Sequence, residues 1–500
     1  MIVGFRGWER ESGRFGMLDA RAKAALPRVS AAYPSGLAPH QVEAAAFLVS
    51  RFGCLLGDEM GLGKTRSALA AALLAGGRAL VIAPAGVRSV WRAEIRSFAP
   101  TVSVSMPTTP SEVRADTARI VIVAYSQLAK LSGALCAARF ETAILDEAQF
   151  VKNARESRRG NAPDTHRTAH AFAACRTVRR VYALSGTPLP SRPRELFNLL
   201  RITRHPLGRR FKSFAYRFCG AERTEYGFKA DGCTSPDTLA ANLTGWLLQR
   251  RKSDVLPELP PKRAVARKVR LSPAEMTAYR HHWFAYITER MKSGNSAWLR
   301  GHQMVKITIL RQRLSELKAA AALTLAQSVE GKVVLFTSFR TTMAAMVAQM
   351  PKGSFVEYHG GLTENARAKA VQKFQNDPNV RFFVGLLEAA KTGINLTAAR
   401  TAIMVDLGWV PADMKQAEDR IHRIGQTEPC KVFYLVAPDT IDDMALAILA
   451  EKRRVTRAVL EGGTWLANDV SETDITRELI ARLGRVPVGS TNAQHQPGLL

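Results

Sequence analysis

The chain has 500 residues, 46% of them hydrophobic, which is too long for one ordinary core and predicts two to four globular domains. Lys and Arg total 71 against 43 Asp and Glu, and the formal net charge of +28 favours a polyanionic partner, although an Arg-rich composition can also reflect genome base composition. A membrane partner is not expected because no apolar run reaches about 18 residues. The cysteines are scattered without a C-x-x-C pair, which argues against a structural metal.

The first half of the chain alternates short apolar runs with Ala-rich helical patterns, which predicts a parallel sheet covered on both faces. After an N-terminal extension over residues 1–34, we expect a first α/β lobe at 35–205. Its apolar runs lie at 54–57, 79–84, 119–126, 142–149 and 180–188.

The same texture returns in a second α/β lobe, expected at 326–465. Its apolar runs lie at 332–339, 354–360, 380–387, 401–409 and 431–438. Between the lobes, residues 206–325 are expected to form a helical insertion and an inter-lobe linker, in which the proline-rich LPELPP is an extended crossing. Residues 466–500 lose periodicity, which predicts a disordered tail.

The segment GDEMGLGKT, residues 57–65, lies between an apolar run and a helical pattern, which is the context of a phosphate-binding loop. Its glycines would let backbone N–H groups approach phosphate oxygens, Lys64 would reach the β- and γ-phosphates, and the Thr65 hydroxyl would bind Mg²⁺. Asp58 stands where the strict pattern has its first glycine, and the alternative is a structural glycine turn. The residues expected to bind nucleotide here are Asp58, Met60, Gly61, Leu62, Gly63, Lys64 and Thr65.

Two acidic residues directly follow the apolar run of AILDEAQ. Asp146 is suited to hold the hydrated Mg²⁺, and Glu147 is suited to polarise the attacking water as a general base. A lone pair of acids after a strand would usually be two surface residues. The phosphate-binding loop upstream favours a catalytic role instead.

The segment QAEDRIHRIGQ, residues 416–426, has mostly helix-forming neighbours and is expected to be helical. Gln416, Arg420 and Arg423 would then share one helix face. The alternatives are a solvated basic face and a pair of arginine fingers that reach the γ-phosphate of a nucleotide held by the first lobe.

The order of the motifs closely resembles the Swi/Snf-type ATPases of helicase superfamily two, over about residues 35–460. The motifs that carry this resemblance are LAPHQVEAAAFL, GDEMGLGKT, ALVIAPAGVRSVWRAEI, DEAQFVKN, VLFTSF, AAKTGINLTAA and QAEDRIHRIGQ. The segment SGTPLPSRPRELFNLL, followed by FKSFAYRFCG, is most similar to the annealing-helicase-like subgroup. The resemblance implies two RecA-like P-loop NTPase lobes, each a parallel sheet flanked by helices.

The resemblance also implies roles for single residues. Gln41 would contact adenine, and Gly393 and Asn395 would contact nucleotide and DNA. A further group, Ser185, Gly186 and Thr187, would couple hydrolysis to DNA contact. Arg420 and Arg423 would be the arginine fingers, with Gln416 orienting the interface between the lobes. The chain departs from the family pattern at Gln149, where His is usual, and at Ala390 and Lys391, where two glycines are usual.

The expected function is that of a DNA-dependent ATPase that translocates along double-stranded or branched DNA, with ATP and Mg²⁺, for fork remodelling or strand annealing. The alternatives are a strand-separating DNA or RNA helicase and an ATP-gated clamp on DNA or RNA polymerase with little turnover. We expect a monomer whose partners are replication, repair or transcription proteins. The compact size favours a bacterial or phage source and the cytoplasm or nucleoid; a eukaryotic source would place the protein in the nucleus.

Basic residues of 201–212 and 249–270 are candidates for contacts to DNA phosphates, although each could equally belong to a solvated surface. Tyr125 either packs in the first lobe or touches the tracking strand. Trp91 is expected to pack in the first lobe, and His422 is expected to be structural.

Overall fold

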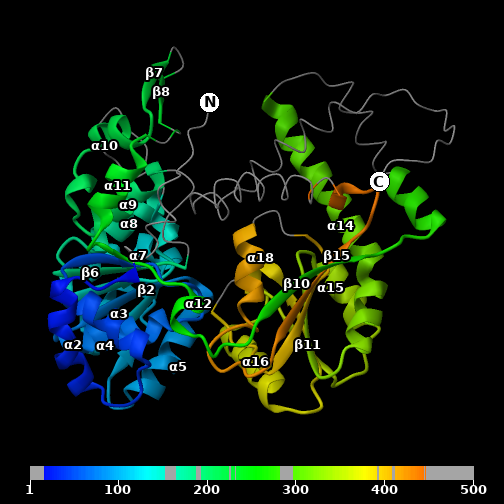
Figure 1. The fold of residues 1–500 in the computed structure, drawn as a ribbon, viewed down its shortest axis with the longest axis horizontal. Coiled ribbons are helices and arrows are strands. Elements are labelled where there is room, and N and C mark those ends of the chain that lie inside the picture. The colour runs from blue at the N-terminus through cyan, green and yellow to red at the C-terminus, as the bar shows by residue number, and fades with distance from the viewer. Residues whose placement is uncertain are drawn as a thin grey trace.

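The chain forms two α/β lobes, which lie side by side in Figure 1. The computed structural model describes residues 16–152, 165–186, 193–224, 227–230, 232, 234–281, 297–390, 393–407, 411–443 and 445. Thr187, Lys391 and the expected tail at 466–500 lie outside these ranges. Within them, no helix has both the length and the apolar character that crossing a bilayer would require.

The first lobe is built on a seven-stranded, all-parallel sheet with strand order β3-β4-β2-β5-β6-β1-β9. In that order the strands are Val104–Ser105, Ile120–Ala124, Ala79–Ala83, Thr142–Leu145, Arg180–Leu184, Gly53–Leu56 and Leu247–Leu248. All five apolar runs predicted for this lobe are strands of this sheet.

Helices cover both faces of the first sheet, because successive residues of each strand point to opposite faces and both sets are apolar. Cys54 and Leu56 join the core that contains α2 to α5, and Leu55 joins the core that contains α7 to α11. The helices of the first face are α2 (Ala20–Ala32), α3 (Pro39–Val49), α4 (Lys64–Ala75) and α5 (Arg88–Phe98). Those of the second are α7 (Leu128–Ala137), α8 (His166–Ala174), α9 (Leu196–Ile202), α10 (Phe211–Phe218) and α11 (Pro236–Leu243), with α6 (Pro110–Ala115) beside α7.

The second lobe is built on a six-stranded, all-parallel sheet with strand order β10-β15-β14-β11-β13-β12. In that order the strands are Lys262–Lys268, Cys430–Val436, Ala399–Met404, Lys332–Thr337, Phe382–Leu386 and Phe355–Tyr358. All five apolar runs predicted for this lobe are again strands. Its helices are α14 (Ala297–Ser328), α15 (Arg340–Val347), α16 (Glu364–Asn376), α17 (Leu387–Ala390) and α18 (Pro411–Glu418).

The region predicted as insertion and linker, 206–325, contributes one strand to each sheet. Strand β9 lies beside β1 in the first sheet, and β10 lies beside β15 in the second. Between them come the short helix α12 (Lys252–Val255) and the LPELPP segment, so the chain crosses between the lobes there. The same region holds an antiparallel hairpin of β7 (Glu222–Thr224) and β8 (Gly227–Lys229).

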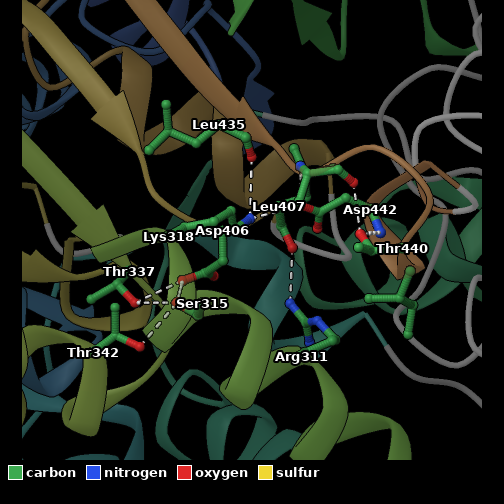
Figure 2. A network of polar contacts seen from close by, with 12 residues as sticks. Arg311, Ser315, Lys318, Thr337, Thr342, Asp406, Leu407, Leu435, Thr440 and Asp442 are labelled. Carbon is green, nitrogen blue, oxygen red and sulfur yellow. Dashed lines mark hydrogen bonds and ion pairs between the residues drawn. The ribbon is translucent and has the colours of Figure 1, made fainter. Parts of the chain in front are cut away.

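Buried polar contacts fix α14 to the second sheet (Figure 2). Asp406, just after β14, accepts hydrogen bonds from the Ser315 hydroxyl of α14 and the Thr337 hydroxyl of β11. One turn along α14, the fully buried Lys318 forms an ion pair with Asp442 at 2.7 Å. These contacts hold the middle of the long helix against the carboxyl edge of the sheet.

Candidate active site

The phosphate-binding loop joins the carboxyl end of β1 to the N-terminus of α4. Gly61 has φ +89° and Gly63 has φ +78°, a backbone conformation that side chains with a Cβ rarely adopt. The loop therefore exposes backbone N–H groups at the positive end of the helix, where an anion is favoured. The sequence prediction of a strand, a glycine loop and a helix is confirmed here.

Gln41 of α3 lies underneath this loop. Its Nε2 donates to the Leu62 carbonyl at 3.4 Å, and its Oε1 accepts from the Ala38 N–H at 3.1 Å. A Cβ built on Gly63 would lie only 2.1 Å from the Gln41 Nε2. The amide therefore supports the loop backbone, and its contact with adenine stays a prediction.

The Asp58 side chain faces away from the loop and binds Arg250, which follows β9. Arg250 donates to the two carboxylate oxygens of Asp58 at 3.1 and 2.5 Å, and both side chains are buried. Arg250 also bonds the carboxylate of Glu43 and the carbonyl of His40. The contribution of Asp58 to the loop is thus an ion pair that shapes it, because its carboxylate is already occupied.

Lys64 begins α4 and lies over the loop. Its Nζ donates to the Asp58 carbonyl at 2.6 Å and to the Glu59 carbonyl at 3.4 Å. Burial lowers the pKa of Lys64, and the carboxylates of Glu147, Asp58 and Asp146 oppose that shift. The ammonium is therefore held within the field of the acidic pair at the end of β5.

Asp146 and Glu147 follow the carboxyl end of β5, as predicted. Asp146 is buried, and its Oδ2 accepts a hydrogen bond from Trp91 Nε1 at 2.8 Å. The Tyr125 hydroxyl donates to the Asp146 carbonyl at 3.0 Å. Tyr125 is buried, which confirms its packing alternative, and Trp91 is both a packing residue and a hydrogen-bond donor to this site.

The pKa of Asp146 is perturbed by its surroundings. Burial, and then the charge of Glu147, raise the pKa of Asp146 to about 6. The Glu147 backbone has φ +48° and its N–H donates to the Asp146 carboxylate at 3.0 Å. The protein does not fully compensate the negative charge of the Asp146 carboxylate, so a cation bound beside it would stabilise the ionised form.

A chain of hydrogen bonds joins Glu147 to the end of β6. Gln149 Nε2 donates to Glu147 at 2.7 Å, and Ser185 Oγ donates to Gln149 Oε1 at 2.9 Å. An amide can donate and accept at once, so Gln149 fills both roles where the family usually has His. Gly186 packs against Met60, because a Cβ built there would lie 2.5 Å from the Met60 Cγ.

The arginine-bearing segment is not the continuous helix that the sequence predicts. Helix α18 ends at Glu418, and Arg420 and Arg423 lie in the turns that follow. Gly425 has φ +96°, outside the helical region, and the Gln426 side chain donates to the carbonyls of Thr397, Ala399 and Ile421. Tertiary contacts have therefore overridden local helix propensity, and the shared helix face does not exist.

Arg420 and Arg423 nevertheless lie at the junction with the first lobe. A Cβ built on Gly61 would lie 2.9 Å from the Arg423 Cβ, so the phosphate-binding loop touches this segment. Burial, and then the charge of Arg420, lower the pKa of Arg423 to about 10. Burial also lowers the pKa of Arg420, and the carboxylate of Glu147 opposes that shift. Two neighbouring guanidiniums therefore lie beside the loop and the acidic pair.

The remaining predicted residues of the second lobe surround the arginines. Arg423 Nη1 donates to the Ile394 carbonyl at 3.3 Å, so the segment that holds Gly393 and Asn395 lies next to it. A Cβ built on Gly393 would lie 3.5 Å from Val87 of the first lobe. Asn395 is exposed, and Gln416 is buried in α18.

The oxygen donors at the start of α4 and the end of β5 suit Mg²⁺, which usually takes one or two protein ligands and completes its shell with phosphate and water oxygens. Thr65 lies in the first turn of α4, and the raised pKa of Asp146 indicates a carboxylate that a cation would stabilise. Within the described ranges, no three or more His, Cys, Asp or Glu side chains are grouped so that they could hold a metal ion.

Several basic residues proposed for DNA contact have internal partners. Arg250 binds Asp58, and Lys252 and Lys262 both bind Asp419. Arg204 donates to the carbonyls of Cys175 and Val178 at the end of α8. Exposed cations remain along β10, at Arg263, Arg267 and Lys268.

Comparison with known proteins places this geometry in a family. Residues 40–323 match the SNF2-related domain, and residues 314–425 match the helicase conserved C-terminal domain. The SWI/SNF-related matrix-associated actin-dependent regulator of chromatin subfamily A-like protein 1 of Xenopus tropicalis is 30% identical over 443 residues, 86% of this chain and 45% of that protein. The DNA annealing helicase and endonuclease ZRANB3 of Mus musculus is 28% identical over 450 residues, 85% of this chain and 41% of that protein.

The chain thus spans less than half the length of these two relatives, and the annealing-helicase name confirms the predicted subgroup resemblance. A solved structure, the Sulfolobus solfataricus SWI2/SNF2 ATPase core in complex with dsDNA, is 23% identical with a TM-score of 0.42, covering 88% of this chain and 97% of that one. Because the SNF2-related match alone spans more than half of the sequence, the chain belongs to the Swi/Snf-type ATPases of helicase superfamily two.

Proposed function

We propose that the protein hydrolyses ATP at the junction of its lobes and uses the reaction to translocate along double-stranded DNA. The observation that carries the proposal is the contact between the two halves of the site. Arg423 of the second lobe packs against Gly61 of the phosphate-binding loop, and the charge of Arg420 is coupled to Glu147. A site divided between two lobes can link hydrolysis to their relative movement.

Each residue then has a defined task. Lys64 and the N–H groups at the start of α4 hold the β- and γ-phosphates, and Thr65 and Asp146 supply oxygen ligands for Mg²⁺, which neutralises phosphate charge. Glu147 accepts the proton of the attacking water.

The two arginines complete the site from the opposite lobe. Arg420 and Arg423 stabilise the negative charge that develops on the transferred phosphoryl group, with Gln416 helping to orient them. Burial lowers the pKa of both arginines, and the charge of Arg420 lowers that of Arg423 further, so an anion bound beside them would oppose these shifts. Because negative charge develops on the transferred phosphoryl group during the reaction, the two arginines stabilise the transition state more than bound ATP.

Two features connect DNA binding to hydrolysis in this proposal: the hydrogen bonds that join Ser185 to Glu147 through Gln149, and the positive charge of the protein. Ser185, which follows β6, bonds Gln149 and through it the general base Glu147. A shift of the Ser185 loop on DNA contact would therefore move or release Glu147. The net charge of +28 supports binding to a polyanion, with a strong dependence on salt.

The name of one relative, a DNA annealing helicase, favours strand annealing as the biological task. We propose fork remodelling as the alternative task, with double-stranded or branched DNA as the track and with replication, repair or transcription proteins as partners. Such a motor works where the DNA lies, in the cytoplasm or nucleoid of a bacterium or in a eukaryotic nucleus. Nothing in the proposed mechanism requires a second copy of the chain, so we propose that it acts as a monomer.

The test is the rate of ATP hydrolysis with no nucleic acid and with duplex DNA, single-stranded DNA, forked DNA or RNA. We expect a low basal rate, strong stimulation by duplex or forked DNA, and loss of the rate in Lys64→Ala. Equal rates with and without DNA would contradict the proposal. Displacement of a triplex-forming strand would support translocation, whereas unwinding of a tailed duplex would favour the helicase alternative and negligible turnover the clamp.

A further inference from the structure

Two lysines on either side of the inter-lobe crossing reach the same carboxylate. Lys252 lies in α12, just before the LPELPP segment, and Lys262 begins β10, just after it. Each ammonium lies 3.0 Å from the Oδ1 of Asp419, which immediately precedes Arg420. We call Lys252, Lys262, Asp419 and His422 the linker clasp, and Figure 1 shows α12 at the junction of the lobes.

Lys252 is the member of the clasp that joins the lobes. Its backbone N–H donates to the Glu59 carboxylate of the phosphate-binding loop at 2.8 Å. Its Nζ bonds Asp419 and also donates to the His422 carbonyl at 2.7 Å. One residue therefore connects the loop that holds phosphate to both ends of the turn that carries Arg420.

Lys262 reaches Asp419 from within the second lobe. It belongs to β10 of the second sheet and forms an additional ion pair with Glu418 at 2.7 Å. The His422 Nε2 donates to the Pro260 carbonyl at 2.7 Å, so the linker backbone is also held on the arginine-bearing turn. These contacts anchor the turn to its own lobe.

The clasp is largely shielded from water, so the attraction between its charges is screened less than in a surface ion pair, and removing one partner leaves a buried charge uncompensated. The side chains of Lys252 and Asp419 are 6% and 1% exposed. Burial opposes ionisation of Asp419, but Lys262 and Lys252 outweigh it and hold its pKa below the ordinary value. Among the described residues its second oxygen, Oδ2, is buried and has no hydrogen-bond partner, so the charge of Asp419 depends on the two lysines at Oδ1 for compensation.

We propose that Lys252 is a positioning residue for hydrolysis, which sets the arginine-bearing turn against the phosphate-binding loop when the lobes meet. The proposal rests on the proposed role of Arg420 and Arg423. It implies that the linker is part of the catalytic geometry rather than a passive tether. Loss of Lys252 should slow the chemical step and leave ATP binding largely intact, because the contacts of the first lobe with phosphate are untouched.

The experiment compares Lys252→Met with Lys262→Met in the ATPase assay with saturating duplex DNA, measuring kcat and KM for ATP. The variants are matched, since each removes one ammonium from Asp419 and leaves the other in place. We expect kcat to fall about tenfold or more in Lys252→Met with KM changed by less than about threefold, a loss of about 1.4 kcal/mol or more in transition-state stabilisation. We expect kcat in Lys262→Met within about threefold of the wild type.

Three further measurements separate this role from a fold defect. Lys252→Arg, whose guanidinium can still reach Asp419, should restore most of kcat. Thermal unfolding of Lys252→Met and Lys262→Met should show similar losses. Equal kcat in these two variants, or a change confined to KM, would overturn the inference. If Arg423→Ala keeps its rate, the proposed arginine role fails; if it collapses while Lys252→Met does not, only the clasp proposal fails.

Discussion

The ion pair between Arg250 and Asp58 gives the sharpest prediction about stability. Their side chains are 4% and 2% exposed, and Arg250 reaches both oxygens of the carboxylate. Arg250→Met would leave Asp58 charged, buried and without this partner. Removing one member of a buried pair costs about 3–5 kcal/mol. The ion pair between Arg250 and Glu43 adds little to that cost, because the Glu43 side chain is 44% exposed and water screens its charge.

The assay is urea unfolding followed by tryptophan fluorescence. For a slope of about 3 kcal/mol/M, a loss of 3–5 kcal/mol lowers the midpoint by roughly 1–1.7 M. The double variant Arg250→Met/Asp58→Asn should recover part of this loss, because the uncompensated charge is gone. ATP affinity should fall in the single variant, since Asp58 also holds Lys64 through its carbonyl.

Two results would refute this reasoning. One is a cost below about 1 kcal/mol for Arg250→Met, which would mean that the pair is hydrated or dispensable. The other is a double variant as unstable as the single one. In that case packing of the long Arg250 side chain, rather than charge compensation for Asp58, would be the source of stability.

Other substitutions test the remaining features. Lys318→Met should cost about 3–5 kcal/mol of unfolding free energy, part of which Asp442→Asn recovers when added. Gly63→Ala should cost more than the roughly 1–2 kcal/mol of a left-handed backbone, because its Cβ would meet Gln41, and it should weaken ATP binding. Gly76→Ala should cost only that strain, since Gly76 has φ +83° and no described residue comes within 4 Å of the added Cβ. Burial holds the pKa of His422 below its ordinary value, so below about pH 6.5 the unfolded chain binds a proton more readily than the folded one, and stability is lost as the pH falls. His422→Gln should therefore lose less unfolding free energy between pH 7 and pH 5.5 than the wild type.

The sequence was most informative where local pattern and burial agree. Parallel strands covered on both faces are continuous apolar runs, and all ten predicted runs are strands. The phosphate-binding loop was readable because its glycines, Lys64 and Thr65 are adjacent in the chain. Strands β3 and β9 escaped prediction because each has only two residues and no periodicity to detect.

Contacts between segments that lie far apart in the chain could not be predicted from the sequence. Arg250 and Lys252 appeared as members of a basic cluster, and only the fold brings them to Asp58 and Asp419. The helical pattern of residues 416–426 was misleading for the same reason, because long-range contacts end α18 at Glu418. Basic residues near a linker therefore predict DNA contacts poorly when the fold pairs them with buried carboxylates, as it does for Arg250 and Lys252.

The central claim is that the second lobe supplies the charge that completes the ATP site. Its most direct test is the hydrolysis rate of Arg423→Ala with duplex DNA, measured together with its affinity for ATP. We predict a rate lower by about a factor of 10³ or more, with ATP affinity within about threefold of the wild type. A rate close to that of the wild type would contradict the account.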